Sequence, residues 1–272
     1  MFRVSYNGSN KKILLQELWR HELEEAVDRN PVIVVPTGSI EQHGPHCSAD
    51  VDISIPFFIA VIAAQQMDDF PVFVAPPVWW GLAHYNKGFP GTISLRAETY
   101  LHLLEDVCMS IWENGFKRIV VLNGHGGNAA PNKVVRDILS EQNMFIITYN
   151  WWDSVEDMIS KSADSDSDVG HAGEWETSAQ LFIREQLVSK PHIGADVPLT
   201  SPFDPETAGF ATFAERRRDT RDRTGIMGDA RVATKEKGKA ILTLASDRLV
   251  TLICEFHSLP IREYREFGTY CP

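Results

Sequence analysis

The chain has 272 residues, of which 43% are hydrophobic and 23% are charged, and its formal net charge is -11 at pH 7. This composition is that of an ordinary globular protein and excludes intrinsic disorder and low complexity. The negative charge would repel a phosphate backbone, so we expect no general binding to nucleic acid and favour a small or cationic partner.

The cysteine pattern and the apolar runs indicate the cellular compartment in which the protein is expected. The four cysteines form no CxxC pair, and we therefore expect a reducing environment. The longest apolar run, residues 57–64, is far too short to span a bilayer, and the N-terminus has no signal-peptide pattern. These features predict a cytoplasmic protein without a membrane segment.

Four short apolar runs alternate with helical patterns along the chain. Both faces of each run are apolar, which is typical of parallel strands covered by helices. The predicted strands are residues 32–35, 72–75, 118–122 and 144–148. The predicted helices are residues 53–66, 97–114 and 132–141, one that runs towards residue 185, and a long one from about residue 234. The alternation predicts one α/β domain over residues 1–272, a layered α/β/α fold with a mostly parallel sheet.

Polar, metal-capable or aromatic residues follow each predicted strand. In open α/β sheets, ligands bind outside the carboxyl ends of the strands. We therefore expect four segments to converge on one pocket, namely residues 41–52, 79–84, 123–128 and 151–153.

The first of these segments contains Glu41, His43 and Asp52. Glu41 and His43 can direct their side chains to one side, and Asp52 can reach the same point from the start of the next helix. Because a carboxylate can bridge two divalent ions, these residues are enough to begin a dinuclear metal centre. The alternative is that Glu41 and His43 are ordinary polar loop residues and that Asp52 caps the helix.

The third segment places His125 between glycines directly after a buried strand. Such glycines permit turns that are closed to other residues and let the backbone approach a ligand. The alternative, a phosphate-binding loop, lacks both of the usual glycine-rich motifs. A metal-binding role for His125 is therefore favoured.

A fourth cluster is His171, Glu174 and Glu176, at the start of a predicted helix. The two glutamates are two residues apart, so they point in different directions and are not expected to share one role. Either could be a first-turn acid that complements the helix dipole. His171 lies in a glycine-rich turn where it could carry a proton near neutral pH.

Aromatic residues also follow two of the strands, as the pairs Trp79-Trp80 and Trp151-Trp152. Buried aromatic side chains normally serve packing, so one or two of these four are expected in the core. We expect Trp80 and Trp152, together with His84, to border the substrate.

Taken together and in chain order, these segments resemble the creatininase (creatinine amidohydrolase) family. The matching elements are PTGSIEQHGPH at 36–46 with Asp52, FPGT at 89–92, NGHGGN at 123–128, HAGEWETS at 171–178, GD at 228–229 and ATKEKG at 233–238. The resemblance implies a layered α/β fold and a dinuclear site for Zn, Mn or Fe. It also implies hydrolysis of a cyclic amide, formamide or related C–N bond, usually by a homohexamer.

Carried over by position, the resemblance assigns the metal ligands, with Asp52 as the bridge. It selects Glu176 over Glu174, and it implies that His171 is the acid/base residue and that Trp152 borders the substrate. The implied ligands are Glu41, His43, Asp52, His125 and Glu176.

One position departs from the family pattern. Creatininase itself carries a glutamate two residues after the histidine that matches His125, whereas this chain has Gly127. The difference argues against creatinine as the substrate and suggests Glu174 as a replacement catalytic carboxylate, with Gly127 bordering the substrate. The same site could serve a peptidase, a non-catalytic metal-binding homologue or a dinuclear phosphoesterase.

Overall fold

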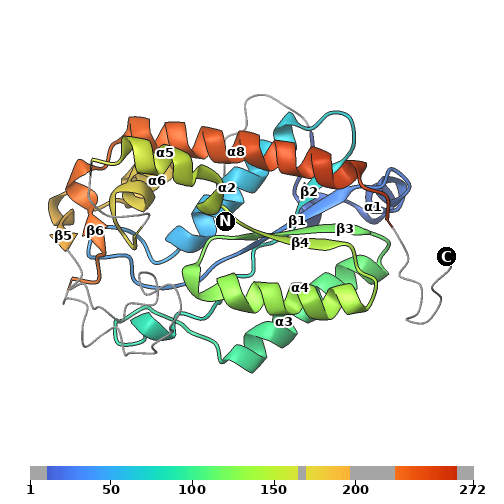
Figure 1. Cartoon of the computed structure of the whole chain (residues 1–272), viewed down its shortest axis with the longest axis horizontal. Coiled ribbons are helices and arrows are strands. Elements are labelled where there is room, and N and C mark those ends of the chain that lie inside the picture. The colour runs from blue at the N-terminus through green and yellow to red at the C-terminus, as the bar shows by residue number, and fades with distance from the viewer. Residues whose placement is uncertain (1–10, 165–169, 197–223, 262–272) are drawn as a thin grey trace, which may run out of the picture.

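The computed structural model describes residues 11–164, 170–196 and 224–261 (Figure 1). Its centre is a sheet of four parallel strands in the order β2-β1-β3-β4. The strands are β1 (Val32–Thr37), β2 (Val72–Val74), β3 (Arg118–Asn123) and β4 (Ile146–Asn150). The predicted parallel sheet is confirmed, and each strand lies within two residues of its predicted bounds.

Helices cover both faces of the sheet, as Figure 1 shows. Helices α2 and α8 pack on one face and contact α6, and α3 and α4 lie on the other. The helices are α1 (Arg20–Val27), α2 (Val51–Gln66), α3 (Ala97–Glu113), α4 (Ala129–Glu141), α5 (Glu156–Ser162), α6 (Glu174–Arg184) and α8 (Lys235–Ser258). The predicted layered α/β/α architecture is therefore confirmed.

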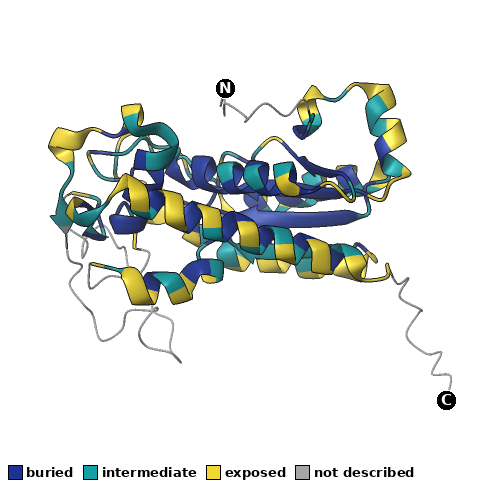
Figure 2. Cartoon of the chain, turned by 90° about the horizontal axis from the view of Figure 1, so that it is seen from above, coloured by how far each residue is buried: buried dark blue, intermediate teal, exposed yellow. Residues whose placement is uncertain are grey.

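Alternation along the strands divides the core in two. Val32 and Val34 of β1 face the cluster formed with α2 and α8, whereas Ile33 and Val35 face the cluster formed with α3 and α4. All four side chains are fully buried, as the continuous apolar run predicts. Figure 2 shows the buried sheet between helices whose outer faces are exposed.

The first turn of α2 lies directly against the carboxyl edge of the sheet. Pro56 has no N–H, so it cannot donate the helical hydrogen bond to the carbonyl oxygen of Asp52. Gly38 follows β1 and Gly124 follows β3, and a Cβ on either would lie 2.3 or 2.1 Å from that oxygen. The two glycines thus allow the close approach that places Asp52 between the ends of the two central strands.

Helices α1 and α5 were not predicted, and two further features also lie outside the predicted elements. A small antiparallel pair joins β5 (Ala195–Asp196) to β6 (Gly228–Asp229). Nearby, His171 pairs with Met227 through two backbone hydrogen bonds of 3.1 and 2.7 Å. Within the described ranges, none of the helices has the length and apolar content needed to cross a membrane.

Candidate metal centre

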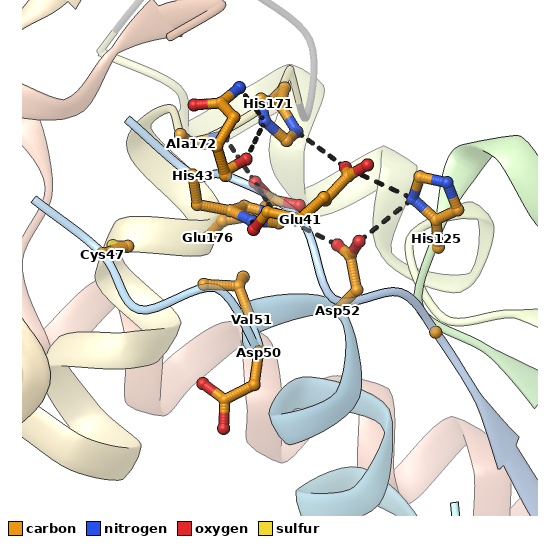
Figure 3. Close-up of polar contacts among 12 residues, drawn as sticks. Glu41, His43, Cys47, Asp50, Val51, Asp52, His125, His171, Ala172 and Glu176 are labelled. Carbon is orange, nitrogen blue, oxygen red and sulfur yellow. Dashed lines mark hydrogen bonds and ion pairs between the residues drawn. The ribbon is translucent and has the colours of Figure 1, made fainter. Parts of the chain in front are cut away.

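Five buried side chains meet beyond the carboxyl ends of β1 and β3 (Figure 3). Three come from the segment after β1 and the first turn of α2, one follows β3, and one belongs to the first turn of α6. They are the residues predicted as metal ligands, Glu41, His43, Asp52, His125 and Glu176, and all of them are buried.

Asp52 lies at the middle of this cluster. Its Oδ1 is 3.1 Å from His43 Nε2, and its Oδ2 is 3.0 Å from His125 Nδ1. The two carboxylate oxygens therefore face different histidines. Asp52 is in the first turn of α2 but is not its cap, because the N-cap position belongs to Asp50.

The potential ligand atoms form three groups, of which two share Asp52 and the third joins His171 to Glu41 and His43. Of the two that share Asp52, one contains Glu41 and His125, and the other contains His43 and Glu176; within each group the three ligand atoms lie within 4.8 Å of one another. Such spacing allows three protein atoms to reach one ion. A carboxylate common to both groups is the arrangement expected of a bridge between two ions.

The hydrogen bonds of the histidines determine which ring nitrogen each one offers. His43 Nδ1 donates to the backbone carbonyl of Glu41 at 3.1 Å, which leaves Nε2 for the centre. His125 Nε2 donates to the backbone carbonyl of Leu82 at 3.2 Å, which leaves Nδ1 for the centre. Metal-binding histidines commonly donate their second ring N–H to a carbonyl or carboxylate in this way.

The chemistry of the donor set fits divalent cations. Glu41 Oε2 is buried and has no hydrogen-bond partner among the described residues. Two imidazole nitrogens and three carboxylates meet in this small buried space, and such a mixture of N and O donors suits Zn²⁺, Mn²⁺ or Fe²⁺. A buried group of carboxylates needs positive charge to offset its desolvation and mutual repulsion.

Without metal, protons supply that charge. Burial alone would lower the pKa of His43, but Asp52 and Glu176 outweigh it and raise the pKa to about 10. Burial likewise opposes protonation of His125, but Glu41 and Asp52 raise its pKa to about 9. Burial raises the pKa of Glu41 and brings that of Glu176 to about 7. The cluster thus holds protons where cations would bind.

His171 lies beside the five predicted ligands, with one ring nitrogen towards a backbone carbonyl and the other towards Glu41. Its Nε2 is 2.7 Å from the backbone carbonyl oxygen of Gln42, and its Nδ1 is 3.5 Å from Glu41 Oε1. Its ring lies 4.3 Å from that of His43, centroid to centroid. Burial and the charge of His43 lower the pKa of His171 to about 3.

The next residue, Ala172, has a φ of +53°, which is a strained conformation for a residue other than glycine. Its backbone N–H donates a hydrogen bond of 2.6 Å to Glu176 Oε2, and this bond helps to hold the conformation.

A cavity of about 810 Å³ opens over the cluster. Trp152, His84 and Gly127 line it, as expected from the sequence. Trp151 is instead buried in the core, with its ring edge-on to that of Trp152. Trp80 is not among the lining residues of this cavity and is 46% exposed. The expectation that Trp80 borders the substrate is thus not supported, because its side chain lies at the surface although Val78 and Gly81 on either side are buried.

Glu174 does not reach the cluster either, although it is only 1% exposed. Its Oε1 accepts a hydrogen bond of 2.6 Å from Lys237 Nζ, and its carboxylate also accepts from the backbone N–H of Asp164 at 3.2 Å. Because residues two apart on a helix point in different directions, Glu176 faces the centre and Glu174 faces α8. The suggestion that Glu174 replaces the missing carboxylate is therefore not supported by its position.

Sequence reasoning missed the contacts that surround His171. Gln42, Asn86 and Gly225 all line the cavity, and the side chain of Gln42 bonds to the other two. Gln42 stands between two predicted ligands, which was the one available signal. Gly225 is 183 positions away, and no local pattern links it to Gln42.

The family model for creatininase, described as creatinine amidohydrolase, matches residues 16–253. The chain belongs to the creatininase family. A creatinine amidohydrolase of Pseudomonas putida is 25% identical over 264 residues, which are 90% of this chain and 98% of that protein. A mycofactocin precursor peptide peptidase of Mycolicibacterium smegmatis is 32% identical over 219 residues, or 78% of this chain and 79% of that protein.

Solved creatininases share the fold. A structure described as a manganese creatininase superposes with a TM-score of 0.79 and 24% identity, covering 92% of this chain and 100% of the other. The creatininase family thus accounts for the layered architecture.

Proposed function

We propose that this chain is a metal-dependent amidohydrolase that binds two divalent ions and cleaves the C–N bond of a small amide. The observation that carries the proposal is the position of Asp52, whose two carboxylate oxygens face His43 and His125 in two separate ligand groups. Membership of the creatininase family supports the same reaction class.

The proposed ligands divide between two ion sites. Glu41 and His125 would hold one ion, His43 and Glu176 the other, and Asp52 would contribute one oxygen to each. Bound divalent ions polarise a carbonyl group and lower the pKa of a water molecule so that it can act as a nucleophile near neutral pH. The protein's part is to fix these ligands in a buried place and to bind the amide beside them.

His171 is proposed to handle the proton at the departing nitrogen. The Nε2 proton is held by the carbonyl of Gln42, so Nδ1 is the atom that can accept a proton and pass it on. Trp152 lines the same cavity and would form one wall against the substrate.

The charges of the cavity favour a neutral or cationic substrate. Beyond the proposed ligands, Asp153 and Glu156 also line it, and no lysine or arginine does so among the described residues. A phosphate ester would have the two proposed ions as its cationic partners but no lysine or arginine beside them. Assay of phosphate esters alongside the amides separates a dinuclear phosphoesterase from an amidohydrolase.

The test combines metal analysis with turnover. The protein would be stripped with a chelator, reloaded with Zn²⁺, Mn²⁺ or Fe²⁺, and assayed on formamides, cyclic amides and short peptides. We expect about two ions per chain and an amidase activity that disappears and returns with metal. Unchanged activity in metal-free His125→Ala protein would contradict the proposal, and bound metal without turnover of any amide would favour a non-catalytic homologue.

A second candidate, a peptidase, is favoured by one comparison. The relative with 32% identity is a mycofactocin precursor peptide peptidase, and a cavity of about 810 Å³ has room for more than a small ring. The same assay separates the two candidates, because a peptidase should cleave the peptides much faster than the formamides and cyclic amides.

We also propose that the chain is a single-domain homohexamer, as the family resemblance implies for the assembly and the α/β alternation for the domain, and that it is cytoplasmic, as its cysteine pattern predicts. Light scattering coupled to gel filtration would measure the mass of the assembly, which for a hexamer is six times that of the chain.

A further inference from the structure

Gln42 stands between two proposed ligands, but its side chain has other partners. Its amide oxygen accepts from the backbone N–H of Gly44 at 2.8 Å, which fixes which end of the amide is Nε2. Gln42 Nε2 lies 2.9 Å from the carbonyl oxygen of Gly225 and 3.1 Å from Asn86 Oδ1. An amide NH₂ has two hydrogens, and these two acceptors use both.

The backbone of Gln42 determines the tautomer of His171. The carbonyl oxygen of Gln42 lies 2.7 Å from His171 Nε2, and because a carbonyl oxygen can only accept, that ring nitrogen carries the proton. Gln42 Nε2 is also 2.9 Å from His171 Nε2, but an amide nitrogen cannot accept, so these two nitrogens do not form a hydrogen bond when His171 Nε2 carries the proton. The lone pair of His171 is therefore on Nδ1, which faces Glu41.

The surroundings leave the Gln42 amide little freedom. Gly225 has φ of +73°, and a Cβ there would lie 2.1 Å from Gln42 Oε1. Thr92 Oγ1 accepts from the backbone N–H of Gln42 at 3.1 Å. Gln42 thus joins three cavity-lining segments, around residues 42, 86 and 225, at the point where its carbonyl meets His171.

We propose that Gln42 is a positioning residue for His171. Its side-chain amide anchors the backbone carbonyl that holds the Nε2 proton, so that His171 presents an unprotonated Nδ1 to the proposed metal centre. The hydrogen bonds of Gln42 and His171 support this inference directly. Only the expected effect on kcat rests on the proposed hydrolase function.

The tautomer can be observed without any assay of activity. Protein labelled with ¹⁵N-histidine and loaded with Zn²⁺ would be studied by solid-state NMR, and the His171 signals assigned from their loss in His171→Gln. We expect His171 to show a protonated Nε2 and an unprotonated Nδ1. A protonated Nδ1 with an unprotonated Nε2 in the wild-type protein would overturn the proposal.

The side-chain role is tested by Gln42→Met, which keeps the length and removes the amide. We expect this variant to retain its zinc but to lose the single tautomer, so that both His171 forms appear. Gln180→Met is a matched control, because it removes a buried amide that bonds to Ser54 and Arg184 and not to His171. Unchanged His171 signals in Gln42→Met would overturn the positioning role.

Kinetics provide the second measurement. If the amidase activity exists, Gln42→Met should lower kcat by about 10- to 100-fold with little change in KM, as part of the 10²–10⁴-fold that a positioned acid/base supplies. An unchanged kcat would overturn the positioning role. If no amide is hydrolysed but the tautomer is as expected, the proposed function fails and the inference about Gln42 stands.

Discussion

Glu174, which is buried, and Lys237, which is partly buried, form an ion pair with Nζ 2.6 Å from Oε1 that joins the start of α6 to the start of α8. Lys237 also bonds to Asp164 and to the carbonyl of Val232. The carboxylate that seemed available for catalysis from the sequence is therefore committed to holding two helices and the end of the α5 segment together.

Glu174→Gln should destabilise the fold and leave the metal centre intact. The substitution leaves the partly buried Lys237 with only the exposed Asp164 as a counter-charge, at a cost of about 2 kcal/mol, between the values for exposed and fully buried pairs. Glu176→Gln is the matched control, two residues away on the same helix, and it should lower metal content instead. Thermal denaturation and metal analysis of both variants make the comparison. Loss of metal in Glu174→Gln, with Glu176→Gln unaffected, would reverse the assignment.

Asp52→Asn should remove both ions, because Asp52 belongs to both ligand groups. Asp50 provides the control: its carboxylate binds Arg184 through two bonds of 2.7 and 2.8 Å and points away from the centre (Figure 3). Asp50→Asn should therefore reduce stability but keep the metal. Metal per chain, measured after gel filtration, should fall from about two to none in Asp52→Asn only. Two retained ions in that variant would rule out the bridge.

Much of the fold was predictable because burial on both faces leaves a plain pattern. The run at residues 32–35 is apolar at every position, and the structure buries alternate side chains in two different clusters. The meeting of the five polar side chains beyond the strand ends was predictable for a related reason. Polar residues such as His125 directly follow buried strands, and the parallel topology brings those strand ends to one edge.

The remaining contacts depend on tertiary structure that sequence spacing does not determine. Helical geometry separates Glu174 from Glu176 but does not say which of them meets Lys237, 63 positions beyond Glu174. The exposure of the Trp80 side chain depends on the conformation of the loop after β2, which sequence spacing does not determine. The bond from Gln42 to Gly225 joins two loops that share no local pattern.

Metal affinity should rise with pH from about 6 to 9. The carboxylates raise the pKa of His43 to about 10 and that of His125 to about 9 in the metal-free protein, and an ion binds only the unprotonated imidazole. Each proton released makes the affinity rise roughly tenfold per pH unit. Calorimetric titration with Zn²⁺ in buffers of different ionisation enthalpy would count the protons.

The control for this titration is His257→Gln, which removes a half-buried histidine that stacks on Phe70 outside the centre and should not change the number of protons released. A heat of binding that is independent of the buffer would contradict the prediction.

The stability of the metal-free protein should change with pH in the opposite direction to the metal affinity. Protonated His43 and His125 stabilise the fold at low pH, and that contribution is lost as the pH rises through about 9 to 10.

Gly127→Ala should weaken metal binding, whereas Gly126→Ala should not. A Cβ at Gly127 would lie 2.4 Å from the Leu82 carbonyl oxygen and 2.5 Å from His125 Nε2, the two atoms of the hydrogen bond that orients His125. A Cβ at Gly126 would meet nothing within 4 Å. Because loss of such a supporting bond typically costs 10- to 100-fold in affinity, we expect a change of about that size for Gly127→Ala alone.

Competition with a chromogenic chelator would measure both affinities. The same crowding gives a physical reason why position 127 carries no side chain, since Leu82 or His125 would have to move to admit one. If Gly127→Ala bound zinc as tightly as Gly126→Ala, the carbonyl of Leu82 would have no part in orienting His125. The lone pair of its Nδ1 would then have to be directed towards Asp52 by packing alone.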